Sequence, residues 1–407
     1  MAAASSLLTL EEAQARLFAV AEPLSIEHVD IEGSLGRYLA YPLLARRTQP
    51  AADLSAMDGY AVGGNDGIGP WRVVGESSAG HPFGGTVETG QAVRISTGAL
   101  LPQGSDSVIV QEDLTRDGDR VLLTGDAPSP ANKHIRRSGM DFREDAEVLP
   151  AGIRIGPAQA ALAISAGHKH LPVRRLVQLA VIDSGDELAV DPECCDLHQI
   201  PASNGRMLAA MARALPCDVR NIGPVPDSID ALLLAFAKAA DADVIVTSGG
   251  ASVGDHDLIR PALEAWGARL DFWKVAIKPG KPILIATRDR QQGRQVIVGL
   301  PGNPGSSLVT AYHFLLPLLR ALAGAAHPAP RRVRVRAGAP LRAGGARREF
   351  LRGFWDGEFA VPHNLQDSGA LASLAASNVL IDRPSHAPGV ERGEEVWAFL
   401  LENGGFA

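Results

Sequence analysis

The segment from Ala242 to Ile259 limits the fold of this chain more than any other stretch. It opens with the β-branched run Val244–Val246, which is typical of a strand buried on both faces of a parallel sheet. The glycine turn Thr247–Gly250 follows, and the carboxylate pair Asp255 and Asp257 then precedes a helical pattern. A strand, a glycine turn and a carboxylate at a helix start predict a phosphate and metal site at the carboxyl end of a strand. An ordinary βα turn with solvated aspartates is the alternative.

The same rhythm of strand, loop and helix is repeated from Val177 onward. The predicted strands are 177–182, 218–222, 243–246, 269–276, 283–287 and 296–300, and the predicted helices are 203–215, 228–240, 257–266 and 306–323. This alternation predicts a three-layer α/β domain with a mostly parallel sheet.

The segments on either side of this region have different patterns. Thr9 and Glu12 form a capping box that starts a helix reaching Val20. Short strand patterns at 71–74, 92–97, 107–111 and 120–124, separated by Gly, Pro and Asp, predict a small β domain. An Ala- and Pro-rich linker follows at 321–332. Further strand patterns at 333–335, 350–359 and 396–400 predict a second small β domain at the C-terminal end.

Composition narrows the class of protein. A chain of 407 residues predicts several domains. A net charge of −7 argues against a general nucleic-acid binder. The three cysteines lack metal-ligand spacing, the first eight residues do not resemble a signal peptide, and no apolar run of about 18 residues is present. We therefore expect a cytoplasmic protein without a membrane span.

The loops that follow the predicted strands carry both charge signs. Lys278 and Lys281 lie in a loop stiffened by two prolines, which favours holding both cations on one anion. The segment Pro301–Ser306 opens a helix, so its N–H groups can bind an oxyanion. Together with nearby carboxylates these loops predict a metal and phosphate site. Surface lysines and a purely structural loop are the alternatives.

Four motifs in order carry a resemblance to a known family. They are Ser-Ala-Met-Asp-Gly-Tyr-Ala-Val (55–62), Ser-Gly-Gly-Ala-Ser-Val-Gly-Asp-His-Asp (248–257), Lys-Pro-Gly-Lys-Pro (278–282) and Gly-Leu-Pro-Gly-Asn-Pro (299–304). The chain resembles the molybdopterin molybdenumtransferases, the MoeA-type proteins, which are similar to the E domain of gephyrin. The resemblance implies an enzyme of molybdenum cofactor biosynthesis. It would insert molybdate into adenylylated molybdopterin, cleave the pyrophosphate link and release AMP, with Mg²⁺ in support.

The resemblance also implies an elongated homodimer of four-domain chains. The implied parts are an arm (1–44 and 142–172), an inserted β domain (45–141), a molybdopterin-binding α/β domain (173–323) and a C-terminal β barrel (324–407). Molybdopterin adenylyltransferase and molybdoenzyme apo-proteins are the implied partners. No nucleic acid or membrane is implied.

By motif, the resemblance assigns roles to individual residues. Asp227 and Asp257 would hold magnesium, and Lys278 and Lys281 would hold molybdate. The other implied catalytic residues are Asp58 and Glu187. Substrate would be bound by Thr97, Arg136, Asp141, Ser248, Gly249, Gly250, Ser252, Gly254, Gly280, Pro301, Gly302, Asn303, Pro304, Ser306, Arg352 and Ser368. Asp58, Thr97 and Asp141 would reach the cleft across the dimer.

The sequence departs from the family pattern at a few positions. Met140 stands where an acidic residue is frequent, and Ala372 stands where serine is frequent. These departures motivate one alternative, a divergent molybdopterin-binding scaffold without turnover. A second alternative is molybdopterin adenylylation, because the α/β domain alone resembles adenylyltransferases of the same pathway. The inserted domain, the arm and the barrel argue against that second alternative.

Overall fold

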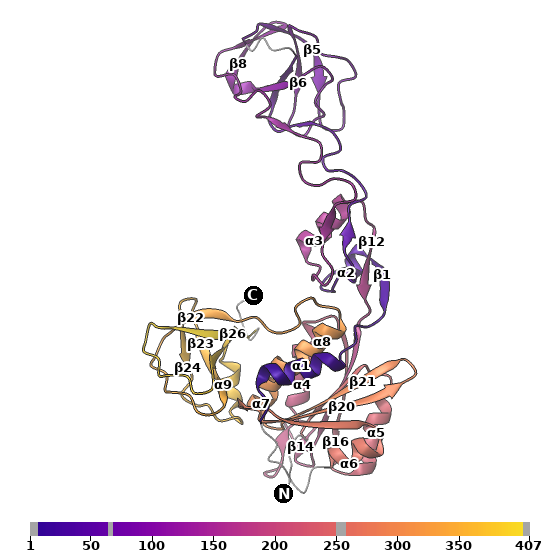
Figure 1. Cartoon of the computed structure of the whole chain (residues 1–407), viewed down its shortest axis with the longest axis vertical. Coiled ribbons are helices and arrows are strands. Elements are labelled where there is room, and N and C mark those ends of the chain that lie inside the picture. The colour runs from indigo at the N-terminus through magenta and orange to yellow at the C-terminus, as the bar shows by residue number, and fades with distance from the viewer. Residues whose placement is uncertain (1–6, 64–67, 250–257, 402–407) are drawn as a thin grey trace.

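The computed structural model describes residues 7–63, 68–249 and 258–401. The molecule is elongated: an α/β body and a β barrel lie side by side at one end, an arm rises from them, and a β lobe sits at the far end of the arm (Figure 1). No helix in these described ranges is long and apolar enough to cross a membrane.

A six-stranded sheet forms the centre of the α/β body. Its spatial order is β16-β13-β17-β21-β20-β18. The first four of these strands run parallel, whereas β20 and β18 are antiparallel to their neighbours. The bounds are β13 Val177–Ser184, β16 Cys217–Val225, β17 Val244–Ser248, β18 Arg269–Lys274, β20 Pro282–Arg290 and β21 Gly293–Leu300. The predicted mostly parallel sheet is therefore confirmed.

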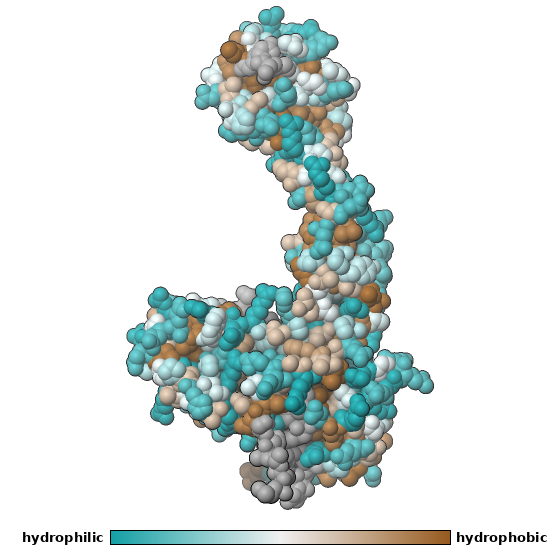
Figure 2. All heavy atoms as spheres, in the orientation of Figure 1, coloured by the Kyte–Doolittle hydropathy of each residue, from teal (hydrophilic) through white to brown (hydrophobic). Residues whose placement is uncertain are grey.

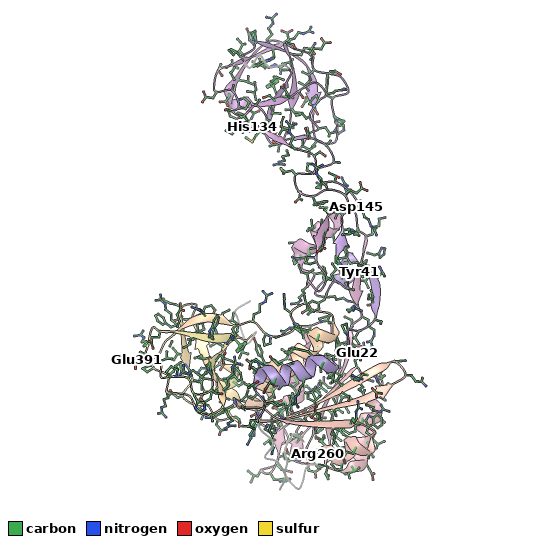
Figure 3. The ribbon with its side chains drawn as sticks, viewed as in Figure 1. Glu22, Tyr41, His134, Asp145, Arg260 and Glu391 are labelled. Atoms are coloured by element: carbon green, nitrogen blue, oxygen red, sulfur yellow. The ribbon has the colours of Figure 1, made fainter. Side chains whose placement is uncertain are left out.

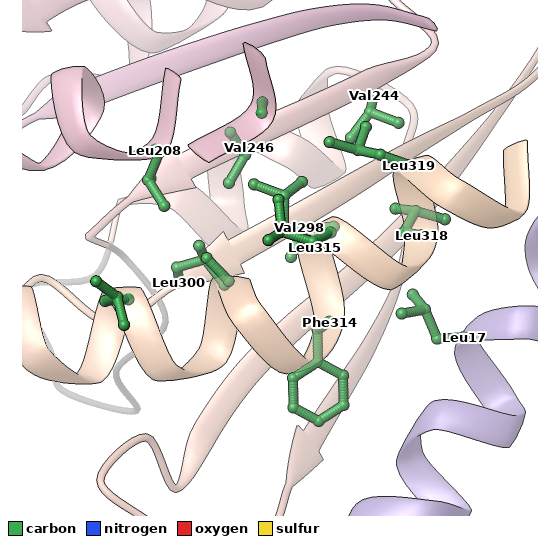
Figure 4. Packing of buried hydrophobic residues seen from close by; sticks show 14 of the residues in the cluster. Leu17, Leu208, Val244, Val246, Val298, Leu300, Phe314, Leu315, Leu318 and Leu319 are labelled. Atoms are coloured by element: carbon green, nitrogen blue, oxygen red, sulfur yellow. The ribbon is translucent and has the colours of Figure 1, made fainter. Parts of the chain in front are cut away.

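Both faces of this sheet are buried, which explains the continuous apolar runs of its strands. Leu179 and Val181 pack on one face with Leu208 and Phe314, while Ile182 packs on the other. Figure 4 shows the first of these cores, where residues of α4, the 304–322 segment and α1 meet the strands. The helices are α1 Leu10–Val20, α4 Asn204–Arg213, α5 Ile229–Lys238, α6 Ile259–Ala265, α7 Pro304–Thr310 and α8 Leu316–Leu322.

The arm is built from two antiparallel ribbons. Strand β1 (Ile26–Asp30) pairs with β12 (His170–Arg174), and β2 (Leu43–Leu44) pairs with β11 (Glu147–Leu149). The short helix α2 (Ile31–Ser34) and α3 (Pro157–Ser165) complete it. Helix α1, which the sequence analysis assigned to the arm segment 1–44, instead packs on the α/β core, because its apolar stripe of Leu10, Ala13 and Leu17 is buried there. The four domain boundaries themselves stay a prediction.

The lobe contains a six-stranded sheet of order β7-β4-β6-β5-β9-β8. Its strands are β4 Gly59–Val62, β5 Trp71–Ser77, β6 Gln91–Ile95, β7 Ser107–Val110, β8 Leu114–Asp117 and β9 Arg120–Leu123, with the 3₁₀ turn η1 at Gln111–Asp113. The small pair β3 (Leu54–Ser55) and β10 (Ile135–Arg136) lies where the lobe joins the arm. Trp71 is buried at the centre of the lobe core.

The C-terminal region closes into a barrel. Strands β23, β24, β22, β26 and β25 form the ring, because β23 pairs with both β24 and β25. Their bounds are β22 Val333–Ala337, β23 Arg348–Trp355, β24 Phe359–Pro362, β25 Val379–Arg383 and β26 Glu395–Leu400, with helix α9 at Leu371–Ala375. Strand β19 (Ile277–Lys278) comes from the α/β body and pairs with β23, so the two parts are joined directly.

Two sequence expectations need correction. The predicted strand 350–359 is two strands, since Asp356 accepts from the N–H groups of Glu358 and Phe359 and turns the chain. The predicted helix 306–323 begins at Pro304 and contains a π-helical turn, η2, at Ala311–Leu315. The strand β25 was not predicted.

Candidate functional site

A pocket opens at the carboxyl ends of the central parallel strands. Register places Asp183 of β13 opposite Ser248 of β17, and Ser248 opposite Leu300 of β21. The volume is about 400 Å³. The lining residues are Asp183, Ser184, Glu187, Leu188, Ile200, Pro201, Ala202, Ser203, Asn204, Ser248, Gly249, Gly302, Asn303, Pro304, Gly369 and Leu371. The two short strands β14 (Leu188–Ala189) and β15 (Ile200–Pro201) form one side of it.

The segment 301–306 meets the glycine turn inside this pocket. Asn303 is the extended N-cap of α7, and Pro304 occupies the first turn, where the missing N–H costs nothing. Gly249 N–H donates to the Leu300 carbonyl at 3.0 Å, which fixes the glycine turn against the end of β21. The predicted residues Ser248, Gly249, Gly302, Asn303 and Pro304 therefore lie together, and Ser306 is buried one turn into α7. Pro301 directly precedes Gly302 in the same loop.

The lysine loop lies against the same helix. A Cβ built on Gly280 would lie 2.4 Å from Thr310 Cγ2 and 3.5 Å from the Ser306 carbonyl oxygen, so the loop packs closely on α7. Lys278 Nζ forms an ion pair with Glu349 Oε1 of the barrel at 2.9 Å. Lys281 is exposed and forms no ion pair with any residue that the structure describes. The loop thus presents one lysine held by the barrel and one in solvent.

Carboxylates gather at the neighbouring strand ends. Asp227 N–H donates to Asp186 Oδ1 at 3.0 Å, which brings the loop after β16 to the loop after β13. Partial burial raises the pKa of Asp227, and the negative charges of Asp186 and Glu187 raise it further. No group of three His, Cys, Asp or Glu with metal-binding geometry is present among the described residues. Carboxylate oxygens are the ligands that Mg²⁺ prefers, but the described carboxylates do not assemble a site for it by themselves.

Asp257, Gly250, Ser252 and Gly254 lie outside the described residues. The magnesium pair of Asp227 with Asp257 therefore stays a prediction.

Arg352 lies beneath the site rather than in it. Its side chain is fully buried, and its guanidinium donates to the carbonyl oxygens of Asp367 at 2.7 Å and Leu365 at 3.4 Å. The carbonyl of Ser368 accepts from Gly305 N–H at 2.7 Å, which docks this loop on the start of α7. Arg352 thus shapes the loop of Ser368, and burial lowers the pKa of its guanidinium.

Four predicted site residues lie in or beside the lobe. Asp58 Oδ1 accepts from the N–H and the hydroxyl of Thr97 at 2.6 and 2.9 Å, and these bonds lower the pKa of Asp58. Arg136 is adjacent through the β3–β10 pair, and Asp141 N–H donates to the Gln49 carbonyl at the root of the lobe. Within one chain this group is separated from the α/β pocket by the length of the arm, as the positions of His134 and Arg260 illustrate (Figure 3).

Sequence reasoning assigned no role to two polar pocket residues, Asp183 and Asn204. Asp183 is 8% exposed, and burial raises the pKa of its carboxyl group, which Gly205 N–H and the nearby Ser248 hydroxyl offset only in part. The available signal was its position directly after the buried run of β13, where strand ends meet ligands.

Three family models match the chain. The model described as "MoeA N-terminal region (domain I and II)" matches residues 8–167. "Probable molybdopterin binding domain" matches residues 180–321, and "MoeA C-terminal region (domain IV)" matches residues 334–401.

Curated proteins and solved structures agree with these matches. The chain is 33% identical over 400 residues to the molybdopterin molybdenumtransferase of Haemophilus influenzae, covering 96% of this chain and 98% of that protein. It is 33% identical over 389 residues to the molybdopterin molybdenumtransferase of a Nostoc species, covering 92% and 88%. It is 32% identical over 341 residues to gephyrin of Dictyostelium discoideum, covering 74% and 47%. The crystal structure of a molybdopterin biosynthesis moeA protein from Pyrococcus horikoshii superposes with a TM-score of 0.83 at 25% identity, covering 97% and 100%.

Proposed function

The chain belongs to the MoeA family of molybdenum cofactor biosynthesis, and on that premise we propose how it works as a molybdopterin molybdenumtransferase. It inserts molybdate into molybdopterin, which is the role of the family. The adenylylated form of molybdopterin is the proposed substrate, and AMP is the proposed second product. The pocket at the ends of β13, β17 and β21 is the observation that carries this proposal.

The proposed chemistry depends on bringing two anions together. Glycine N–H groups and the start of α7 suit the pyrophosphate of the substrate, and Lys278 and Lys281 suit molybdate. Positive charge that is already in place stabilises the charge that develops as the pyrophosphate link breaks. No covalent nucleophile of the protein is required if a molybdate oxygen attacks the activated phosphate. Because Glu349 holds Lys278 in the free protein, molybdate binding exchanges one anionic partner of this lysine for another.

Magnesium is the proposed supporting ion. Asp227 and Asp257 are the carboxylates proposed to hold it, and Asp257 lies outside the described residues. When bound there, Mg²⁺ supplies positive charge to the pyrophosphate oxygens.

We further propose that the working form is a homodimer. The lobe is remote from the pocket of its own chain (Figure 1), so Asp58 and Thr97 in the lobe and Asp141 at its root would contribute to the pocket of a second copy. The arm also exposes hydrophobic side chains, and patches of this kind interrupt the hydrophilic surface in Figure 2. They are Ile26, Leu35, Tyr41, Leu44 and Ile164, each between 42% and 58% exposed. Exposed apolar surface of this kind is typical of an interface. We also propose a cytoplasmic location, with molybdopterin adenylyltransferase and molybdoenzyme apo-proteins as partners.

The experiment is to incubate the protein with adenylylated molybdopterin and Mg²⁺, with and without molybdate, and to measure AMP. We expect molybdate to stimulate AMP release, and Lys278→Ala or Asp227→Ala to reduce it by at least about tenfold, since each removes a charged contact to an anion or a metal. Arg334→Ala, at an exposed pair with Glu395 on the barrel, is the matched control and should leave the rate unchanged. AMP release without molybdate dependence would contradict the proposal, as would full activity in either site variant.

A further inference from the structure

Asp183 is a buried carboxylate in the pocket that none of the proposed steps uses. Its Oδ2 accepts from Gly205 N–H at the start of α4, at 2.9 Å. Its Oδ1 accepts no well-aligned hydrogen bond within the described part of the chain, although the Ser248 hydroxyl lies nearby. A carboxylate that is only 8% exposed and half satisfied is costly unless a ligand completes it.

The surrounding backbone is built to accept this carboxylate. A Cβ on residue 205 would lie 2.2 Å from Asp183 Oδ2 and 2.7 Å from its Cγ, so only glycine leaves room for the side chain. The N-terminus of α4 also favours a negative charge at this place. Asp183 is therefore held in one position, and it belongs to the pocket lining.

Asn204 adds a second unsatisfied acceptor to the same pocket. Its Nδ2 donates to the Gly302 carbonyl at 2.6 Å, which fixes the orientation of the amide. Its Oδ1 is buried and has no partner among the residues that the structure describes. Two residues of one pocket lining thus have acceptors without donors, which a ligand with N–H groups could complete.

The remaining walls indicate the shape of that ligand. Leu188, Ile200 and Leu371 supply apolar surface next to the two acceptors. Apolar walls with a few fixed polar groups are typical of a site for a small heterocycle.

We propose that Asp183 and Asn204 bind the N–H edge of the pterin ring, namely its 2-amino group and the adjacent ring N–H. The two donors of this edge lie side by side, and both acceptor residues line the same pocket. Oδ2 of Asp183 keeps a second lone pair beyond the Gly205 bond, so both carboxylate oxygens can accept. Asp183 is then a specificity residue for the pterin, and the inference rests on the proposed molybdopterin-binding function.

The test compares two fluorescent heterocycles. The first is a 2-amino-4-oxopteridine, and the second is the corresponding 2,4-dioxopteridine, in which oxygen replaces the amino group. Titration without Mg²⁺ should give at least about tenfold tighter binding of the amino compound, as one charge-assisted hydrogen bond provides. Asp183→Asn should reduce this preference to less than about threefold, because the amide faces the amino group with weaker acceptor strength.

Two further variants complete the test. Gly205→Ala keeps the charge but displaces the carboxylate, so it should also lose the preference. Asp218→Asn, at an exposed position of β16, is the matched control and should keep it.

The outcomes separate the two proposals. If Asp183→Asn lowers the melting temperature but leaves the preference for the amino compound unchanged, Asp183 only caps α4. This result would overturn the inference. Equal binding of both heterocycles by the wild type, with molybdate-dependent AMP release intact, would overturn the inference and leave the function standing. If the wild type shows no pterin binding and no molybdate-dependent AMP release, both the inference and the proposed function are overturned. If Asp183→Asn does not fold, Gly205→Ala and the wild-type comparison still decide.

Discussion

Replacing Gly280 by alanine tests whether the close packing of the lysine loop on α7 holds the site together. Gly280 has a φ of +98°, and its added methyl would lie 2.4 Å from Thr310 Cγ2. Gly293, at the start of β21, has a φ of +105° but no atom within 4 Å of its built Cβ. The two substitutions therefore carry similar backbone strain, and only the first adds a clash.

The expected loss of stability follows from the backbone strain and the steric clash. A left-handed conformation costs a non-glycine residue about 1–2 kcal/mol, so we expect that loss in Gly293→Ala. Carbon atoms normally approach to about 3.5–4.0 Å, so the overlap with Thr310 is more than about 1 Å and should add about 1–3 kcal/mol of overpacking. The expected loss in Gly280→Ala is then about 2–5 kcal/mol.

Thr310→Ser separates the clash from the strain. Serine keeps the hydroxyl that donates to the Ser306 carbonyl at 2.7 Å and removes the methyl that the alanine side chain at position 280 would meet. The double variant should regain most of the overpacking term, which gives a coupling of about 1–3 kcal/mol in a double-mutant cycle.

The assay is hydrogen exchange of the α7 amides, combined with calorimetric melting and AMP release. Local exchange is preferred because unfolding of a multidomain chain is not two-state. Gly280→Ala should lose protection in α7 and lose activity, while Gly293→Ala should keep both. Equal effects of the two substitutions, or no rescue by Thr310→Ser, would refute the argument.

Two further predictions concern buried ionisable groups. Burial acts to raise the pKa of Asp243, but hydrogen bonds from Arg175 and from Gln178 N–H, with the charge of Arg290, outweigh it and lower the pKa. Its stabilisation should therefore be present above about pH 4 and be lost as the pH falls through the folded-state pKa. Asp243→Ala should cost about 3–5 kcal/mol at pH 7, measured by calorimetry, because it leaves two arginines without their partner; a loss under about 1 kcal/mol would contradict this. Burial lowers the pKa of His313 to about 3, so between pH 6.5 and 3 only the unfolded state binds the proton, and stability should fall as the pH falls. His313→Leu should flatten this slope between pH 7 and pH 5, and an unchanged slope would show that His313 does not cause it.

Local signals explain how much of the fold was predictable. The capping box of Thr9 and Glu12 forms as predicted, since Thr9 accepts from Glu12 N–H and the Glu12 side chain accepts from Thr9 N–H. The six strands of the α/β sheet were predicted because their runs are buried on both faces and end at Gly, Pro or Asp. The prediction of one strand over 350–359 was wrong because the Asp356 side chain forms a turn there. The apolar periodicity of the sequence contains no signal for such a turn. The π turn at Ala311–Leu315 is a backbone irregularity inside an apolar run, so it leaves no mark in the pattern.

The candidate site was predictable as a set of loops but not as a set of contacts. The carboxyl-end rule brought Ser248, Gly302 and Asn303 together without coordinates. The partner of Lys278 is Glu349, from a distant strand of the barrel, and no local pattern indicates such a pair. Asp183 was missed because its significance depends on the space left by Gly205, which only the fold reveals.

The two ends of the lobe meet at its base. Gln49 N–H donates to the Phe142 carbonyl at 2.9 Å, and Phe142 N–H returns to the Gln49 carbonyl, so the chain leaves the arm and re-enters it at one place. The lobe is therefore inserted like a long loop. The arm already holds the two ends of this loop together. The entropy of closing a loop depends only weakly on its length, so a short turn could replace the lobe at little thermodynamic cost to the sheet below. The lobe can thus be exchanged or removed as a unit, and the residues that it carries can be adapted independently of the fold that binds the pterin.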